Sequence, residues 1–207
     1  MDSIRVLPAE DFDAAAGVLA RAFDTTEQWR RMVPLEGDAR VRKLDEMFRG
    51  TLTTAAAAKS LTETTADLEG VAIWFPPGRT MGMWPMIRSG FAGSRFLLTR
   101  PRLSFRTFMR ALREFEASHK RVMPEPHWYL MALGVDPEHA GCGHGSALVR
   151  HGIEKAEADG KPAYLETELD NVGFYERLGF TVVEEVLIKA IDLPFALMRR
   201  PGSREGT

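Results

Sequence analysis

The chain has 207 residues, one cysteine and a formal net charge of −2, from 27 Lys and Arg against 29 Asp and Glu. A hydrophobic fraction of 44% with 27% charged residues excludes a disordered chain, and the length is enough for one domain to bury its own core. The lone Cys142 excludes an intramolecular disulfide and a cysteine-rich zinc site and suits a cytoplasmic protein. The length alone allows one or two domains, and the order of the motifs described below favours a single domain over residues 1–207.

The first half of the chain alternates short apolar runs with helical patterns. The patterns predict, in chain order, a strand at 4–7, a helix ending near Phe23, a helix over 38–52 with Asp38 as candidate N-cap, strands at 59–64 and 70–75, and helices between 79 and 122.

The sequence patterns of secondary structure are clearer in the second half of the chain. It predicts a strand at 128–135, a helix near 143–158, a strand at 163–167, a short helix at 171–178 and strands at 180–186 and 191–198. The apolar run at 128–135 is typical of a strand buried on both faces. Because strands and helices alternate, the expected fold class is α/β or α+β with one mixed sheet.

Residues 95–121 form a basic segment with eight cations and only two acids. The cations are Arg95, Arg100, Arg102, Arg106, Arg110, Arg113, Lys120 and Arg121. Two interpretations stay open, a solvated helix face and a surface that attracts an anionic ligand.

Three glycines follow the strand at 128–135 and precede a helix. Gly141, Gly143 and Gly145 permit positive φ and leave backbone N–H groups accessible to an anion at the positive end of that helix. The spacing is neither the dinucleotide fingerprint nor a P-loop. A phosphate cradle and a tight turn without a ligand both remain open at this point.

Two motifs together resemble the GNAT superfamily of acetyl-CoA-dependent N-acetyltransferases. The first runs from Val135 through the three glycines to Leu148, and the second contains Leu165-Glu166-Thr167 and the uninterrupted run 174–180, Phe-Tyr-Glu-Arg-Leu-Gly-Phe. Within the superfamily, residues 126–183 resemble the puromycin N-acetyltransferase group. One position departs from the pattern, because Ala140 stands where the superfamily usually has Gln or Arg before the first loop glycine.

The resemblance implies a GNAT fold, a mostly antiparallel mixed sheet whose two central parallel strands splay apart and are flanked by helices. It also implies transfer of an acetyl group from acetyl-CoA to a primary amine by direct attack in a ternary complex. The residues that it implies for binding acetyl-CoA are Leu133, Gly134, Val135, Gly141, Cys142, Gly143, His144, Gly145, Ser146 and Asn171, mainly through backbone groups.

Two residues are implied in the chemistry. Tyr175 matches the usual general acid, with an ordinary aromatic of a short helix as the alternative. Glu166 is the candidate general base, with a carboxylate that only bonds to backbone, Tyr or Arg neighbours as the alternative. Asn171 is expected either to cap the short helix, to reach the pantetheine, or both.

Aromatic and methionine side chains in the first half are expected to form the acceptor pocket. We predict substrate contacts for Trp29, Trp74, Phe75 and Trp84, and the alternative is that these side chains belong to the core or a lid. A small-molecule amine, such as an aminoacyl-nucleoside drug or another natural product, is the nearest analogy. A protein or peptide N-terminal acetyltransferase and a non-catalytic acyl-CoA binder are the rival functions.

The remaining partner classes are not expected. The balanced charge gives no reason for a nucleic-acid partner, and no apolar run is long enough for a membrane span. His139, His144 and His151 lack the spacing of zinc ligands, so no metal is expected. The protein is expected to be a monomer or a homodimer.

Overall fold

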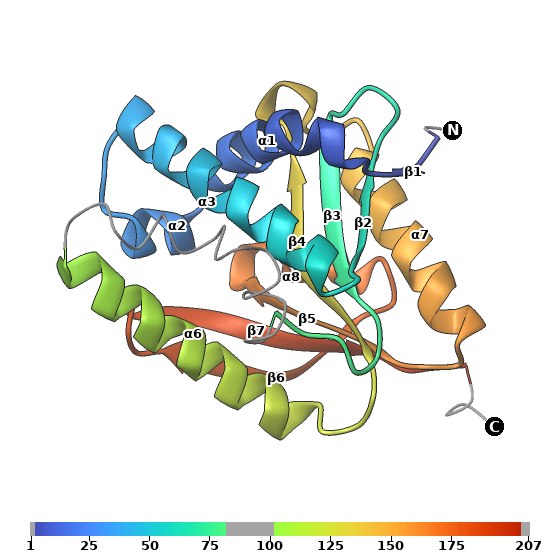
Figure 1. Cartoon of the computed structure of the whole chain (residues 1–207). Coiled ribbons are helices and arrows are strands. Elements are labelled where there is room, and N and C mark those ends of the chain that lie inside the picture. Colours follow the sequence, from blue (N-terminus) through green and yellow to red (C-terminus); the bar gives the residue numbers. More distant parts are fainter. Residues whose placement is uncertain (1–2, 82–101, 204–207) are drawn as a thin grey trace.

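A computed structural model describes residues 3–81 and 102–203, and its centre is one seven-stranded sheet (Figure 1). The strand order is β1-β2-β3-β4-β5-β7-β6, and β4 with β5 is the one parallel neighbour pair of this sheet. The strands are β1 Arg5–Val6, β2 Leu61–Thr64, β3 Gly70–Phe75, β4 Trp128–Val135, β5 Ala163–Glu168, β6 Thr181–Ile188 and β7 Leu193–Arg200. The expected fold class is therefore confirmed.

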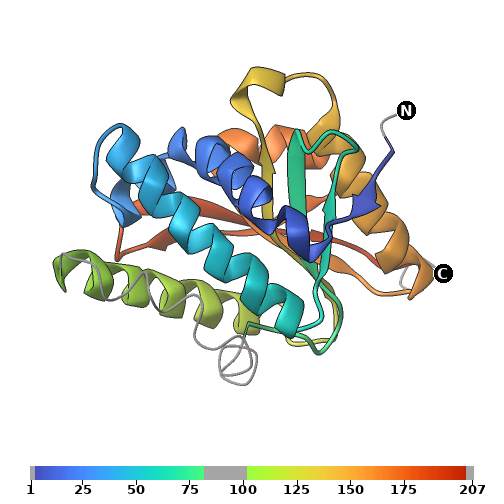
Figure 2. The same ribbon diagram turned by 45° about the horizontal axis from the view of Figure 1, so that its top comes forward.

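Helices cover both faces of the sheet (Figure 2). They are α1 Phe12–Asp24, α2 Glu27–Met32, α3 Asp38–Ala57, α6 Arg102–Val122, α7 His144–Ala158 and α8 Val172–Glu176. Buried side chains of α1, α3 and α6 form one core cluster with one face, and those of α7 and α8 form a second cluster with the other. None of the helices in the described part of the chain is long and apolar enough to cross a membrane.

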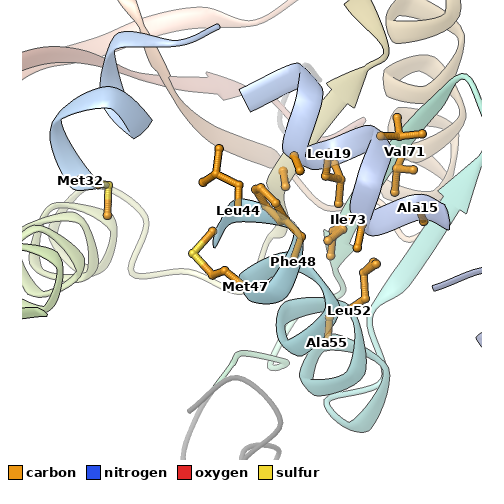
Figure 3. Packing of buried hydrophobic residues seen from close by; sticks show 14 of the residues in the cluster. Ala15, Leu19, Met32, Leu44, Met47, Phe48, Leu52, Ala55, Val71 and Ile73 are labelled. Atoms are coloured by element: carbon orange, nitrogen blue, oxygen red, sulfur yellow. The ribbon is translucent and has the colours of Figure 1, made fainter. Parts of the chain in front are cut away.

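The first core cluster holds α1 close to the sheet (Figure 3). Leu19 of α1 packs with Phe48 of α3 and Ile73 of β3, and all three are almost completely buried. On β4, a Cβ atom at Gly134 would lie 2.9 Å from Leu19 Cδ2 and 3.1 Å from Ala22 Cβ. The absence of a side chain at Gly134 thus allows α1 to approach the central strand closely.

Two local expectations about helices are wrong. The helix at 38 extends to Ala57, beyond the expected end at 52, and its N-cap is Gly37 with φ of 52°. Asp38 is the first helical residue, where its charge still favours the helix N-terminus. The short helix α2, whose N-cap Thr26 accepts a hydrogen bond from the Trp29 amide, was not anticipated. Six residues give too little periodicity to predict a helix.

The parallel strands β4 and β5 separate soon after they start. They pair only at Trp128 with Ala163 and at Tyr129 with Tyr164. On its other side β4 has a bulge, because Ile73 pairs with Ala132 and Trp74 pairs with Leu130. Alternate side chains of β4 remain partly exposed, so burial on both faces is wrong. The reason is that the gap between the strands is hollow.

Candidate active site

Two cavities open where β4 and β5 diverge. Their volumes are about 290 Å³ and about 480 Å³, and the first lies beside α1 while the second lies beside the glycine loop. Both are lined by the same four residues, Leu133, Val135, Asn171 and Tyr175. The site therefore has two chambers that meet at Tyr175.

The second cavity is bounded by the glycine loop and the start of α7. Gly141 and Gly143 have φ of 81° and 93°, and no atom lies within 4 Å of a Cβ placed on either. Backbone N–H groups and the N-terminus of a 15-residue helix therefore border open space. This arrangement fits an anion such as the pyrophosphate of coenzyme A. The residues lining the cavity are Leu133, Val135, His139, Ala140, Gly141, Gly143, His144, Gly145, Ser146, Asn171, Phe174 and Tyr175.

Two predicted loop residues differ in their surroundings. Cys142 carries an exposed free thiol and does not line either cavity. His144 is 7% exposed, and its Nε2 lies 3.8 Å from Glu69 Oε1. Neither side chain has a geometry that indicates a chemical role.

A buried carboxylate anchors the start of the loop to α1. Asp136 accepts a hydrogen bond of 2.9 Å from Arg21 Nε and one of 3.2 Å from the Glu138 amide. Burial opposes ionisation of this carboxyl, but the two hydrogen bonds outweigh it and lower the pKa of Asp136. The contact fixes the loop relative to the helix that borders the first cavity.

The first cavity contains two carboxylates and no cationic lining residue among the described part of the chain. Glu166 and Glu168 come from β5, and their neighbours are polar or apolar groups of α1, α2 and β4. Glu168 also accepts a hydrogen bond of 3.0 Å from the Gln28 amide, which ties β5 to α2. A cavity with this lining attracts a positively charged ligand.

Glu166 is the more deeply buried of the two carboxylates. Its side chain is 6% exposed, Oε2 accepts a hydrogen bond of 2.7 Å from Tyr129, and Oε1 has no hydrogen-bond partner. Burial raises the pKa of Glu166 to about 7, although the interactions with the Tyr129 and Tyr164 hydroxyls act in the opposite direction. A carboxyl that titrates near neutral pH can accept or release a proton under physiological conditions.

Tyr175 lies at the junction of the two cavities. Its ring packs edge-on against Phe174 and Phe180, with centroid distances of 4.9 and 6.0 Å. Burial raises the pKa of Tyr175, so the phenol stays protonated at neutral pH. No described residue hydrogen-bonds to its hydroxyl, which leaves that proton available to a ligand.

Asn171 occupies the N-cap position of α8 but makes no capping hydrogen bond with its side chain. The expected capping role is therefore wrong. The residue lines both cavities, which leaves the contact with pantetheine as the remaining expectation.

The structure places three of the four predicted acceptor residues away from the cavities. Trp74 and Phe75 are almost completely buried in the two core clusters, because β3 is covered on both faces. Trp29 is half-buried among Phe23, Phe48 and Phe108 and lines neither cavity. Their predicted substrate contacts are thus replaced by packing roles. Trp84 lies outside the described residues.

Sequence reasoning missed three polar residues next to Glu166. Tyr129 donates to Glu166, His119 Nδ1 lies 3.8 Å from Glu166 Oε1, and His127 Nε2 lies 2.6 Å from His119 Nε2. No motif or regular spacing marks these residues, and their proximity depends on α6 ending against β4 and β5. Within the described ranges, no group of three His, Cys, Asp or Glu side chains is arranged to hold a metal ion.

Comparisons with known proteins find similarity to acetyltransferases. Residues 106–180 match the model of the acetyltransferase (GNAT) family. An uncharacterised N-acetyltransferase of Schizosaccharomyces pombe is 27% identical over 186 residues, which cover 87% of this chain and 74% of that protein.

Solved structures share the fold. A histone acetyltransferase HPA2-related acetyltransferase from Corynebacterium glutamicum has a TM-score of 0.69 and 23% identity, with 98% of each chain covered. The PaiA N-acetyltransferase of Thermoplasma acidophilum, solved in complex with coenzyme A, has a TM-score of 0.55 and 13% identity, covering 97% of this chain and 99% of that one. Identities this low establish the likeness of fold alone.

Proposed function

We propose that this chain, whose residues 106–180 match the acetyltransferase (GNAT) family, transfers an acetyl group from acetyl-CoA to the primary amine of a small molecule. The observation that carries this proposal is the pair of cavities that meet at Tyr175, one beside an anion-binding loop and the other lined by two carboxylates. The cavity beside the glycine loop suits the donor, and the cavity lined by the two carboxylates suits a cationic amine.

Donor binding uses mainly backbone groups. The pyrophosphate lies on the N–H groups of residues 141–146 and on the positive end of α7. The pantetheine enters the gap beside β4 like an additional strand and bonds to main-chain groups of Leu133 and Val135. The Asn171 amide, which makes no bond within α8, is directed to the pantetheine amides.

Acceptor activation falls to Glu166. An alkylamine is an ammonium ion at neutral pH and cannot attack until it loses a proton. Glu166 and Glu168 attract this cation, and Glu166, with its pKa raised to about 7, removes the proton directly or through water. The neutral amine then attacks the thioester carbonyl, whose oxygen is polarised by the backbone N–H of Leu133.

Collapse of the tetrahedral intermediate completes the transfer. The carbon–sulfur bond breaks, and Tyr175 donates its phenolic proton to the departing thiolate of coenzyme A. The phenolate recovers a proton from the nitrogen that has become the amide. General acid assistance of this kind is worth about 10²–10⁴ in rate.

The size of the acceptor cavity favours a small molecule over a peptide. A volume of about 290 Å³ lies at the lower end of the range for small-ligand sites. A protein N-terminal acetyltransferase needs an extended groove for the peptide backbone. A non-catalytic binder of acyl-CoA has no need for Tyr175, which lines both cavities and whose hydroxyl has no hydrogen-bond partner among the described residues.

Thiol release from acetyl-CoA tests the proposal with a panel of amines. The panel contains puromycin, an aminoglycoside, spermidine, 2-phenylethylamine and short peptides with free N-termini. Release that depends on one of the small amines, with the acetylated product seen by mass spectrometry, supports the proposal. Release with the peptides alone would favour the N-terminal acetyltransferase, and binding of coenzyme A without any release would favour the binder.

A further inference from the structure

A line of polar atoms leads from Glu166 away from the acceptor cavity. Glu166 Oε1 lies 3.8 Å from His119 Nδ1, His119 Nε2 lies 2.6 Å from His127 Nε2, and His127 Nδ1 lies 2.6 Å from the carbonyl oxygen of Glu125. The four groups come from β5, the end of α6 and the segment that follows α6.

The hydrogen bonds determine where the protons lie on the two imidazoles. A carbonyl oxygen only accepts, so His127 Nδ1 carries a proton and donates it to Glu125. In a neutral imidazole the other nitrogen is then an acceptor, so His127 Nε2 accepts from His119 Nε2–H. His119 Nδ1 is consequently unprotonated, and its lone pair is the one nearest to Glu166 Oε1.

Glu166 is more deeply buried than the two histidines. The Glu166 side chain is 6% exposed, the His119 side chain is 20% exposed, and His127 is half-buried at the surface. The His119 ring packs against Tyr129 and Tyr164, with centroid distances of 4.5 and 4.6 Å. The imidazoles are therefore held in place between a buried carboxyl and solvent.

The reaction itself requires an exit for a proton. An ammonium acceptor loses two protons when it becomes an amide, and the thiol of coenzyme A takes up only one of them. The other proton is released at each turnover. A neutral amine loses one proton, which the thiol takes up, so no net release occurs.

We propose that His119 and His127 form a relay that carries the proton taken up by Glu166 from the acceptor ammonium to the solvent. This inference rests on the proposed function. Protonated Glu166 gives its proton to His119 Nδ1 while His119 gives its Nε2 proton to His127 Nε2. His127 becomes an imidazolium and then releases its Nδ1 proton to water. Both imidazoles return to their starting tautomers by ring rotation or by proton exchange with water before the next turnover. No bond other than N–H and O–H bonds changes, and the net charge is conserved at each transfer.

The 3.8 Å separation between Glu166 and His119 is longer than a hydrogen bond. Catalytic hydrogen bonds are often long in a protein without its substrates and shorten in the complex. Oε1 makes no hydrogen bond of normal geometry, although the Tyr164 hydroxyl interacts with the Glu166 carboxylate, and a proton shared between Oε1 and His119 Nδ1 draws the two atoms together. The contact between Glu166 Oε1 and His119 Nδ1 is unfavourable only while neither atom carries a proton.

The electrostatic surroundings keep the relay neutral between turnovers. Burial and the neighbouring His127 lower the pKa of His119 to about 4, and burial lowers the pKa of His127. Both imidazoles are therefore neutral at neutral pH and become protonated only transiently during transfer. The titratable and charged groups around them are Glu116, Lys120, Arg121, Glu125, Tyr129, Tyr164, Glu166, Glu184 and Arg199.

Two acceptors that differ in basicity give the kinetic test. Thiol release is measured at pH 8 with 2-phenylethylamine, which is an ammonium ion, and with 2,2-difluoro-2-phenylethylamine, which is largely neutral there. In His119→Gln and His127→Gln we expect kcat to fall about tenfold for the first amine and little for the second. Small buffer bases such as imidazole should restore the rate with the first amine in the variants.

His151→Gln is the matched control. His151 is a half-buried histidine of α7 whose Nδ1 lies 2.7 Å from Glu63 Oε1, on a different side of the sheet from α6. In this variant, kcat for each of the two amines should be close to the wild-type value. Equal losses for both amines in the His119 and His127 variants, without rescue by buffer, would overturn the relay in favour of a structural role.

A second test does not need an acceptor. Long-range ¹H–¹⁵N correlation of histidine-labelled protein at pH 7.5 should find His119 protonated at Nε2 and His127 protonated at Nδ1, with assignments from the two variants. A His119 that is protonated at Nδ1 or is an imidazolium would overturn the relay. If the wild type acetylates no amine, the proposed function fails, and the tautomers still decide whether the relay geometry exists.

Discussion

Tyr129 and Glu166 join β4 and β5 through their side chains just beyond the point where the two strands stop pairing. The last paired residues are Tyr129 and Tyr164, and the hydrogen bond of 2.7 Å from Tyr129 to Glu166 Oε2 reaches two residues further along β5. The candidate base is thus fixed at the apex of the gap, where the first cavity begins.

The hydrogen bond from Tyr129 stabilises the ionised carboxylate of Glu166, and burial opposes ionisation. If Glu166 is the base, activity falls as pH drops through its pKa of about 7. Tyr129→Phe should move this acidic limb of kcat/KM to higher pH, by about one unit, because it removes a donor to the charged form. Glu166→Gln should abolish the limb. A limb that stays in both variants would show that another group is the base.

Tyr175→Phe tests the general acid. The change keeps the ring that packs against Phe174 and Phe180 and removes only the hydroxyl at the junction of the cavities. We expect kcat to fall about 10²-fold or more, with the affinity for coenzyme A by calorimetry nearly unchanged. Full turnover in this variant would contradict the assigned role.

Ala140 lines the second cavity directly before the first loop glycine. Ala140→Gln adds an amide that can donate to the pyrophosphate, so the affinity for acetyl-CoA should rise or stay unchanged by calorimetry. A neutral hydrogen bond contributes about 1 kcal/mol, which corresponds to about fivefold in Kd. A clear loss of affinity would mean that the loop binds its anion in a different register.

Asp136→Asn tests the contact between the loop and α1. Because the pKa of Asp136 is lowered in the folded protein, its ionisation adds stability above the unfolded pKa of about 4, and this contribution disappears as pH falls through the lower, folded pKa. The variant should lose about 1 kcal/mol in urea unfolding at pH 7, and this loss should shrink progressively as pH falls below about 4. A loss independent of pH would indicate packing instead of charge.

Gly152 of α7 lies against the buried indole of Trp74. A Cβ atom there would be 2.2 Å from Trp74 Cε2 and Nε1, and the indole has no free space to move into. Gly152→Ala should therefore reduce the free energy of unfolding by about 3 kcal/mol. Gly173→Ala in α8 is the control, since the nearest atom is 3.6 Å away on the flexible side chain of Arg177. This control should be neutral or slightly stabilising.

The sequence by itself determined the strands at 70–75 and 128–135 and the helix near 143–158, almost to the residue. Local signals decide these elements, because apolar runs and glycine turns act within a few residues of chain. The resemblance of the two motifs to the GNAT superfamily also indicated the fold class and a central pair of parallel strands that splay apart. Tyr175 and Glu166, both inferred from motifs, lie at the gap between these strands.

Only the tertiary structure decided which side chains face the cavities. Trp74 looks like a pocket residue in the sequence but is buried, because helices cover both faces of β3. His119 and His127 carry no sequence signal, yet the packing of α6 against β4 and β5 brings them into line with Glu166. A pattern of residues fixes local conformation, whereas the direction of a side chain and the pKa of a carboxyl depend on distant segments that pack around it.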